Sequence, residues 1–156
     1  MNEPRERIED LLPQDPPMIL LSGCGPETDP GRADAWVDVS PASPFFEIAP
    51  DGVPSCVALE YIAQAAALLV GRRRRRGGLA PAIGFVLGSR RLETSVPFFE
   101  NGRRYGVSAS CSYEDGEFAS FDCEIRDDRG AVVASARLSA YQPPDGAVPE
   151  NTGTSE

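Results

Sequence analysis

One acidic residue, Glu60, stands in the middle of a long apolar segment, VPSCVALEYIAQAAALLVG at positions 53–71. Cys56, Glu60 and Gln64 are spaced four residues apart, so on an α-helix they share one stripe. Carboxylates are rarely buried without a partner, because removing the charge from water is costly. A carboxylate that faces a cavity in such a helix suits acid or base chemistry on a ligand. The alternative is that Glu60 and Gln64 only satisfy each other or buried backbone groups.

The chain contains no histidine, and this excludes the Ser-His-Asp and Cys-His classes of nucleophile. Its cysteines, at positions 24, 56, 111 and 123, form no CxxC pair, and without a cysteine cluster or a histidine no structural zinc site is expected. No other metal and no cofactor is expected. Cys56 would lie at a helix N-terminus, where thiols become more reactive, but a small apolar filler is the simpler interpretation. The net charge of −9 argues against a general nucleic-acid binder.

The elements around Glu60 predict a single domain over residues 1–142, followed by a polar tail at 143–156 that is expected to be disordered. A helix is predicted over 54–71, with Arg72–Arg76 and then Gly77–Gly78 at its C-terminal end. Strands are predicted at 18–24, 33–40, 83–96, 103–113, 117–127 and 131–142, with tight turns at 115–117 and 127–130. Prolines and Gly52 predict a loop over 40–54.

A helix that is apolar nearly all round must be wrapped by other elements, and a curved antiparallel sheet is the material that remains. The order of the predicted strands and helix along the chain therefore indicates an α+β architecture, the hotdog fold, with the sheet around the central helix. No stretch is expected to reach the roughly 20 apolar residues of a membrane span. The N-terminal sequence MNEPRERIEDLLPQ is too polar for a secretory signal, so a cytoplasmic location is expected.

The run PSCVALEYIAQAAALL resembles the central helix of the hotdog-fold dehydratases that act on 3-hydroxyacyl groups carried by acyl carrier protein (ACP). Their helix carries a catalytic acid in the pattern E-x-x-A-Q, which Glu60, Ala63 and Gln64 match here. The similarity extends over roughly residues 11–143 and is closest to the aryl-polyene-type subgroup. It includes the flanking segments LLPQDPPMILL, SPFFE, IGFVLGSRRLETSVPF, FDCEI and ARLSAYQP.

The resemblance implies a lyase of fatty-acid or polyene-type biosynthesis that acts on acyl-ACP or acyl-CoA thioesters. Glu60 would protonate the departing hydroxyl, while a loop histidine removes the α-proton. Backbone N–H groups around Ser55 and Cys56 would polarise the thioester carbonyl. A dimer with a continuous sheet is also implied. The other candidate site residues are Gln64 beside the acid, and Gln14, Phe45 and Phe46 in substrate binding. Phe45, Phe46, Phe98 and Phe99 are candidates for either the tunnel lining or the dimer contact.

The sequence departs from the family pattern in its lack of histidine, and Gln14 stands where relatives often carry one. Glu47 and Asp51 are the loop candidates for a substitute base. Three functions stay open: an active dehydratase with Glu60 as acid or base, a half-catalytic or non-catalytic subunit, and a hotdog acyl thioesterase. The second would pair with a histidine-bearing homologue in a heterodimer, whereas the first could be a homodimer.

The arginine run Arg72–Arg76 also allows two interpretations. It is either a solvated helix end or a docking surface for an acidic carrier protein. The aromatic residues Trp36 and Tyr61 are most simply core or interface residues. No nucleic-acid or membrane partner is expected.

Overall fold

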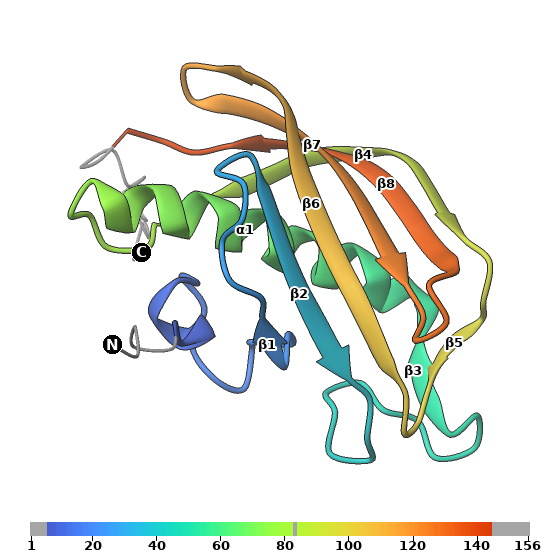
Figure 1. Cartoon of the computed structure of the whole chain (residues 1–156). Coiled ribbons are helices and arrows are strands. Elements are labelled where there is room, and N and C mark those ends of the chain that lie inside the picture. The colour runs from blue at the N-terminus through green and yellow to red at the C-terminus, as the bar shows by residue number, and fades with distance from the viewer. Residues whose placement is uncertain (1–5, 83, 145–156) are drawn as a thin grey trace, which may run out of the picture.

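A computed structural model describes residues 6–82 and 84–144 and shows a curved antiparallel sheet around one long helix (Figure 1). Helix α1 spans Ala58–Arg76 and follows a 3₁₀ turn, Ser55–Val57. The main sheet has the strand order β1, β2, β6, β7, β8, β4. These strands are β1 Gly23–Cys24, β2 Arg32–Asp38, β6 Arg104–Asp115, β7 Phe118–Arg126, β8 Val132–Tyr141 and β4 Phe85–Thr94. The predicted arrangement of a sheet wrapped around one helix is confirmed.

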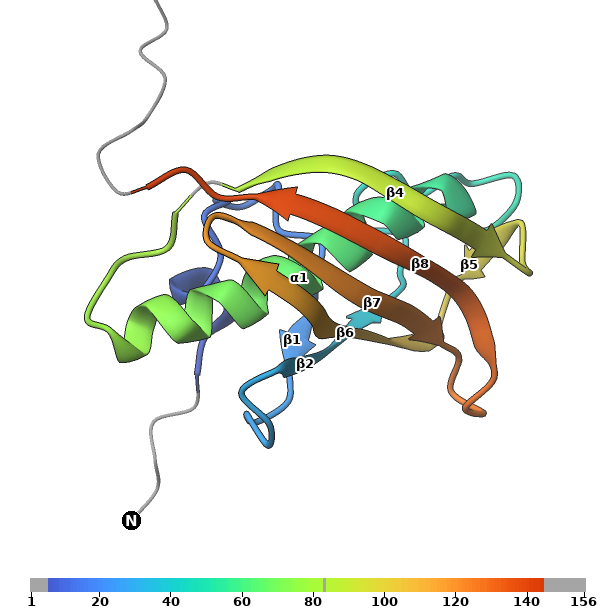
Figure 2. The same cartoon turned by 90° about the horizontal axis from the view of Figure 1, so that it is seen from above.

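The strand that follows the helix in the sequence, β4, lies at the edge of the sheet farthest from β1 (Figure 2). It pairs antiparallel with β8, the last strand. A second, two-stranded sheet joins β3 (Gly52–Pro54) to β5 (Phe98–Glu100). Each of its strands has only three residues, too few for a visible alternation, so neither was predicted.

The strands and turns follow from alternation and from glycine. Along β2, Ala33, Ala35 and Val37 are buried while the residues between them are more exposed, as predicted. The turns that join β6 to β7 and β7 to β8 contain Gly116 (φ 58°) and Gly130 (φ 83°). Both lie in the left-handed region that favours glycine.

Helix α1 extends five residues beyond the predicted end at Gly71 and includes the whole arginine run. Arginine favours helix, and the helix ends only where Gly78, at φ 72°, follows the C-cap residue Gly77. The backbone N–H groups of Gly78 and Leu79 donate to the carbonyl oxygens of Arg75 and Arg74, a Schellman motif.

The N-terminal strap, residues 6–22, lies against α1 instead of forming the predicted strand over 18–24. Only Gly23–Cys24 pairs with β2. A Cβ atom at Gly71 would collide with the carbonyl oxygen of Leu11, so glycine allows this close approach. The buried guanidinium of Arg72 forms an ion pair with Glu6 at 2.9 Å. The strap is therefore attached to the C-terminal half of the helix.

The core beneath the sheet contains a contiguous aromatic group. The ring of Phe99 lies 5.4 Å from that of Tyr61 and 5.0 Å from that of Tyr105. Phe99 is fully buried, so its prediction as a tunnel or dimer residue is wrong, because the two-stranded sheet turns it into the core. Burial raises the pKa of Tyr61 to about 12, and this residue stays a neutral phenol.

By length and composition alone, Ser55–Arg76 could cross a membrane, contrary to the expectation from the sequence. More than half of its most apolar window is buried inside the fold, as in the core helix of a protein that crosses no membrane. Residues 145–156, most of the predicted tail, lie outside the described residues.

Candidate active site

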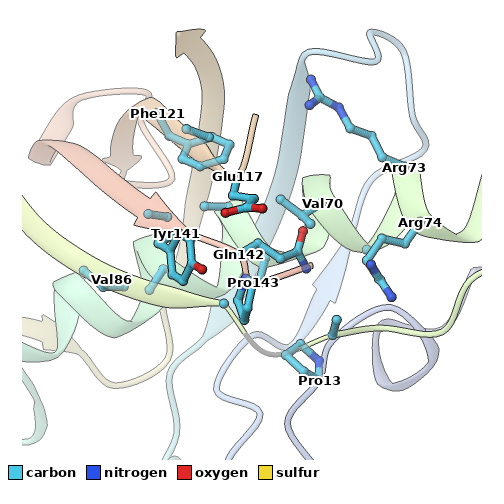
Figure 3. A pocket seen from close by; sticks show the side chains of 18 of the residues that line it. Pro13, Val70, Arg73, Arg74, Val86, Glu117, Phe121, Tyr141, Gln142 and Pro143 are labelled. Atoms are coloured by element: carbon cyan, nitrogen blue, oxygen red, sulfur yellow. The ribbon is translucent and has the colours of Figure 1, made fainter. Parts of the chain in front are cut away.

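A cavity of about 550 Å³ lies between α1 and the sheet. One helix face contributes Glu60, Ala63, Ala67, Val70 and Arg74, which recur every three or four residues. The rest of the wall comes from the strap, the β6–β7 hairpin and the strands beyond it, through Leu11, Pro13, Gln14, Val86, Glu114, Glu117, Phe121, Leu138, Tyr141 and Gln142. Figure 3 shows side chains from these separate elements around the cavity.

Glu60 is exposed in the single chain, whereas its position in an apolar helix had predicted burial. The residues on the other face of α1, which include Tyr61, Ile62, Leu68 and Leu69, are buried in the core. The face that carries Glu60 is otherwise built largely from small alanines. Alanine is common in buried helices, so the sequence does not show that the fold leaves this face open. Glu60 is therefore a carboxylate at the edge of a cavity.

Gln64 is fully buried, and both the oxygen and the nitrogen of its side-chain amide form hydrogen bonds. Its Oε1 accepts hydrogen bonds from the N–H groups of Leu20 (2.8 Å) and Leu21 (3.4 Å). Its Nε2 donates to the carbonyl oxygen of Met18 (2.8 Å) and to Oε1 of Glu60 (3.1 Å). Gln64 thus joins the strap to the helix and orients the carboxylate of Glu60.

Replacing Gln64 by leucine is expected to destabilise the fold, because the Leu20 N–H and the Met18 carbonyl would lose a buried partner. The loss should be about 1–3 kcal/mol for each group left unpaired. Chemical denaturation measures it as a lower midpoint. The control is Gln142→Leu, at a partly exposed position, which should change stability by no more than about 0.5 kcal/mol. Equal effects of the two changes would contradict the structural role of Gln64.

Gln14 lies at the same cavity as Glu60. Its Oε1 atom is buried and has no hydrogen-bond partner among the described residues. Buried polar atoms are normally paired, so the contacts of the described residues leave this acceptor unexplained. Its predicted role in substrate binding stays a prediction.

The other predicted binding residues do not line this cavity. Ser55 lies at the start of the helix, but its N–H donates to the carbonyl oxygen of Pro97 at 3.0 Å. This N–H group is therefore not available to a thioester. The next N–H groups of the first turn lack acceptors within the helix. Cys56 is exposed near this end. Phe45 is 60% exposed, and Phe46 packs partly against the core.

The described residues of the chain place no clear substitute base beside Glu60. Neither Glu47 nor Asp51 lines the cavity, and Asp51 accepts a hydrogen bond from Asn101 at 3.1 Å. Of the carboxylates that do line it, Glu114 forms an ion pair with Arg73 at 2.7 Å, while Glu117 is exposed.

The arginine run is largely used within the fold. Arg72 pairs with Glu6, Arg73 with Glu114 and Arg76 with Glu27. Arg73 and Arg74 also line the cavity, which the sequence analysis missed. Counting helical turns from Glu60 would have found Val70 and Arg74, whereas the strap and hairpin residues carry no comparable signal.

Comparison with known proteins identifies the family to which this chain belongs. The model of the ApeP-like family, described as ApeP dehydratase, matches residues 6–150. The structure of "The Dehydratase Heterocomplex ApeI:P from Xenorhabdus doucetiae" is 29% identical over 88% of this chain and 91% of that chain, with a TM-score of 0.80. No sequence among the curated proteins matches.

Two more distant structures support the hotdog fold alone. The Escherichia coli PaaI protein of the phenylacetic acid degradation operon is 15% identical over 75% of this chain and 80% of that chain, with a TM-score of 0.59. A hypothetical thioesterase with coenzyme A from Streptococcus pneumoniae TIGR4 is 11% identical over 78% of this chain and 87% of that chain, with a TM-score of 0.60. Since the family model covers nearly the whole sequence, this chain belongs to the ApeP-like family of hotdog-fold dehydratases.

Proposed function

We propose that this protein is one subunit of a 3-hydroxyacyl thioester dehydratase, in which Glu60 is the catalytic acid and a histidine-bearing homologue supplies the base. The observation that carries the proposal is an oriented carboxylate at the open side of a cavity, in a chain that has no histidine. The heterocomplex of dehydratases from Xenorhabdus doucetiae supports pairing of this kind.

The reaction needs two groups, a base at the α-carbon and an acid at the leaving hydroxyl. The partner's base removes the proton from the α-carbon, and the electron pair left there forms the new double bond as the bond between the β-carbon and its hydroxyl breaks. The Glu60 carboxyl group donates its proton to the leaving hydroxide, so that water departs. Gln64 is a positioning residue, because it holds one carboxylate oxygen of Glu60.

The thioester carbonyl would be polarised by backbone N–H groups in the first turn, those of Cys56 and Val57, where the positive end of the helix dipole lies. The cavity along Ala63, Ala67 and Val70 would receive the acyl chain, with the amide of Gln14 beside it. A carboxyl group serves as a general acid near neutral pH when its site excludes water. Because Glu60 is exposed in the single chain, the partner must complete its enclosure.

Turnover by the separate and mixed subunits tests the proposal. The purified chain, a histidine-bearing hotdog dehydratase from the same genome and their mixture are each offered 3-hydroxyacyl and saturated acyl thioesters, on CoA and on ACP. We expect enoyl thioester from the mixture and at most a trace from this chain alone, as followed by mass spectrometry of the acyl product.

Two other results would overturn it. Full enoyl formation by this chain alone would mean that histidine is dispensable and that no partner is needed. Release of free thiol without enoyl product would identify a thioesterase, in which one helix carboxylate acts alone.

A further inference from the structure

The cavity that contains Glu60 extends along most of α1. Glu60 and Arg73 both line it and are thirteen residues apart, which is about 20 Å along the helix axis. The acyl chains of one bilayer leaflet span about 15 Å, half of the hydrocarbon core. The cavity is therefore long enough for a long-chain acyl group that begins beside Glu60.

The wall of the cavity changes from apolar to charged along this length. Beyond Glu60, the helix contributes Ala63, Ala67 and Val70, and the sheet contributes Phe121 and Leu138 (Figure 3). A methylene group gains affinity when it leaves water for a surface of this kind. The last turn of the helix that reaches the cavity presents charged side chains instead, so the gain ends there.

An ion pair joins the two walls at the charged end. Nη1 of Arg73 donates to both carboxylate oxygens of Glu114, at 2.8 and 2.7 Å. Arg73 lies on α1 and Glu114 on β6, and both residues line the cavity. Their side chains are also 31% and 52% exposed. The Arg73–Glu114 pair therefore lies between the cavity and solvent.

The hairpin that carries Glu114 is attached to the neighbouring strand. The N–H group of Gln142 donates to the carbonyl oxygen of Glu117 at 2.8 Å, and the rings of Phe118 and Tyr141 are 5.1 Å apart. These contacts hold the backbone near Glu114 in place. A chain that reached the pair would have to displace water from two charges, and this cost offsets the gain from burying more methylenes.

We propose that the Arg73–Glu114 pair is the end wall of the acyl site and determines the longest acyl group that still gains affinity from each added methylene. The acyl nature of the ligand rests on the proposed function. Shorter chains fill only the apolar part of the cavity, whereas longer chains meet the ion pair and gain nothing further.

Binding of a homologous series of S-alkyl-CoA thioethers to the full chain tests the proposal. These probes cannot be dehydrated or hydrolysed, and they are used below the concentrations at which they form micelles. Isothermal titration calorimetry should show an affinity that rises about threefold to fourfold per methylene. The rise should stop at a long-chain length, where the alkyl group reaches the pair.

Two variants should move this break in opposite directions. In Arg73→Leu/Glu114→Leu the apolar wall continues, so the longest probe should bind at least about tenfold more tightly than to the wild type, as two buried methylenes provide. In Ala67→Leu the larger side chain fills the middle of the cavity. The longest probes should then bind at least about tenfold more weakly, and the shortest within about twofold of the wild type.

The matched control is Arg137→Leu/Asp122→Leu. It removes another exposed ion pair, at 2.8 Å, from residues that do not line the cavity. It should keep the wild-type break.

A break that stays in place in Arg73→Leu/Glu114→Leu would overturn the proposal. So would a wild-type affinity that does not depend on chain length, or one that rises without a break. Thermal unfolding of each variant confirms that it is folded. Because binding of the thioethers needs neither a histidine nor a proton from Glu60, the end-wall proposal can survive a failure of the dehydratase assay, and the reverse.

Discussion

Glu60→Gln is expected to lower enoyl formation by the two-subunit complex by about 10²- to 10⁴-fold, the usual contribution of a general acid. The amide has nearly the shape of the carboxyl group, and its oxygen can still accept the hydrogen bond that Gln64 donates. It cannot release a proton to the leaving hydroxide. Stability should change by no more than about 0.5 kcal/mol, so a loss of rate would report chemistry and not folding.

The matched control for this change is Glu117→Gln, which removes another exposed carboxylate from the wall of the same cavity. It should leave the rate within a few-fold of the wild type. Single-turnover assays with saturating thioester separate the chemical step from binding. If Glu60→Gln retained the wild-type rate, or if both variants lost activity equally, Glu60 would not be the acid.

Gly71→Ala is expected to be the most destabilising single-methyl change in the helix. In an exposed helix, alanine would gain about 1 kcal/mol over glycine. Here the new Cβ would meet the carbonyl oxygen and carbon of Leu11, which are backbone atoms and cannot rotate away. Overpacking of this kind costs about 1–3 kcal/mol or more, which should lower Tm by roughly 4–10 °C.

The strap would also move outward in this variant, and it carries the cavity residues Leu11, Pro13 and Gln14. Ligand binding should therefore weaken along with stability. Gly106→Ala is the control, because a Cβ there meets nothing within 4 Å. Alanine in this strand should be neutral or stabilise by about 0.5 kcal/mol. A Gly71→Ala protein with an unchanged Tm would show that the strap is not held against the helix.

The fold was predictable because its signals are local. Alternation identified β2 and β8, glycine turns identified the two hairpins, and an apolar helix without a polar face required a sheet to wrap it. The strand prediction was wrong for residues 18–22. This segment is apolar like a strand, but the N–H groups of Leu20 and Leu21 donate to the side chain of Gln64 and not to a neighbouring strand.

The candidate site was predictable only in part. The spacing of Glu60 and Gln64 correctly placed them within hydrogen-bond reach. The same spacing also suggested that both side chains lie on one face of the helix with similar burial, whereas Glu60 is exposed and Gln64 is fully buried. Phe99 was misassigned because a phenylalanine in a short loop-like segment looks the same in a sequence whether it lines a tunnel or packs in a core.

The sequence by itself determined the sheet-and-helix architecture and the presence of one acidic residue in the central helix, because both depend on periodicity over a few residues. Only the tertiary structure decided which face of the helix stays open and which partners Gln64 binds. These outcomes depend on contacts such as those from Gln64 to Leu20 and Met18, which are 44 and 46 residues away in the sequence. No local pattern specifies such contacts, because they form only when the strap and the helix pack together.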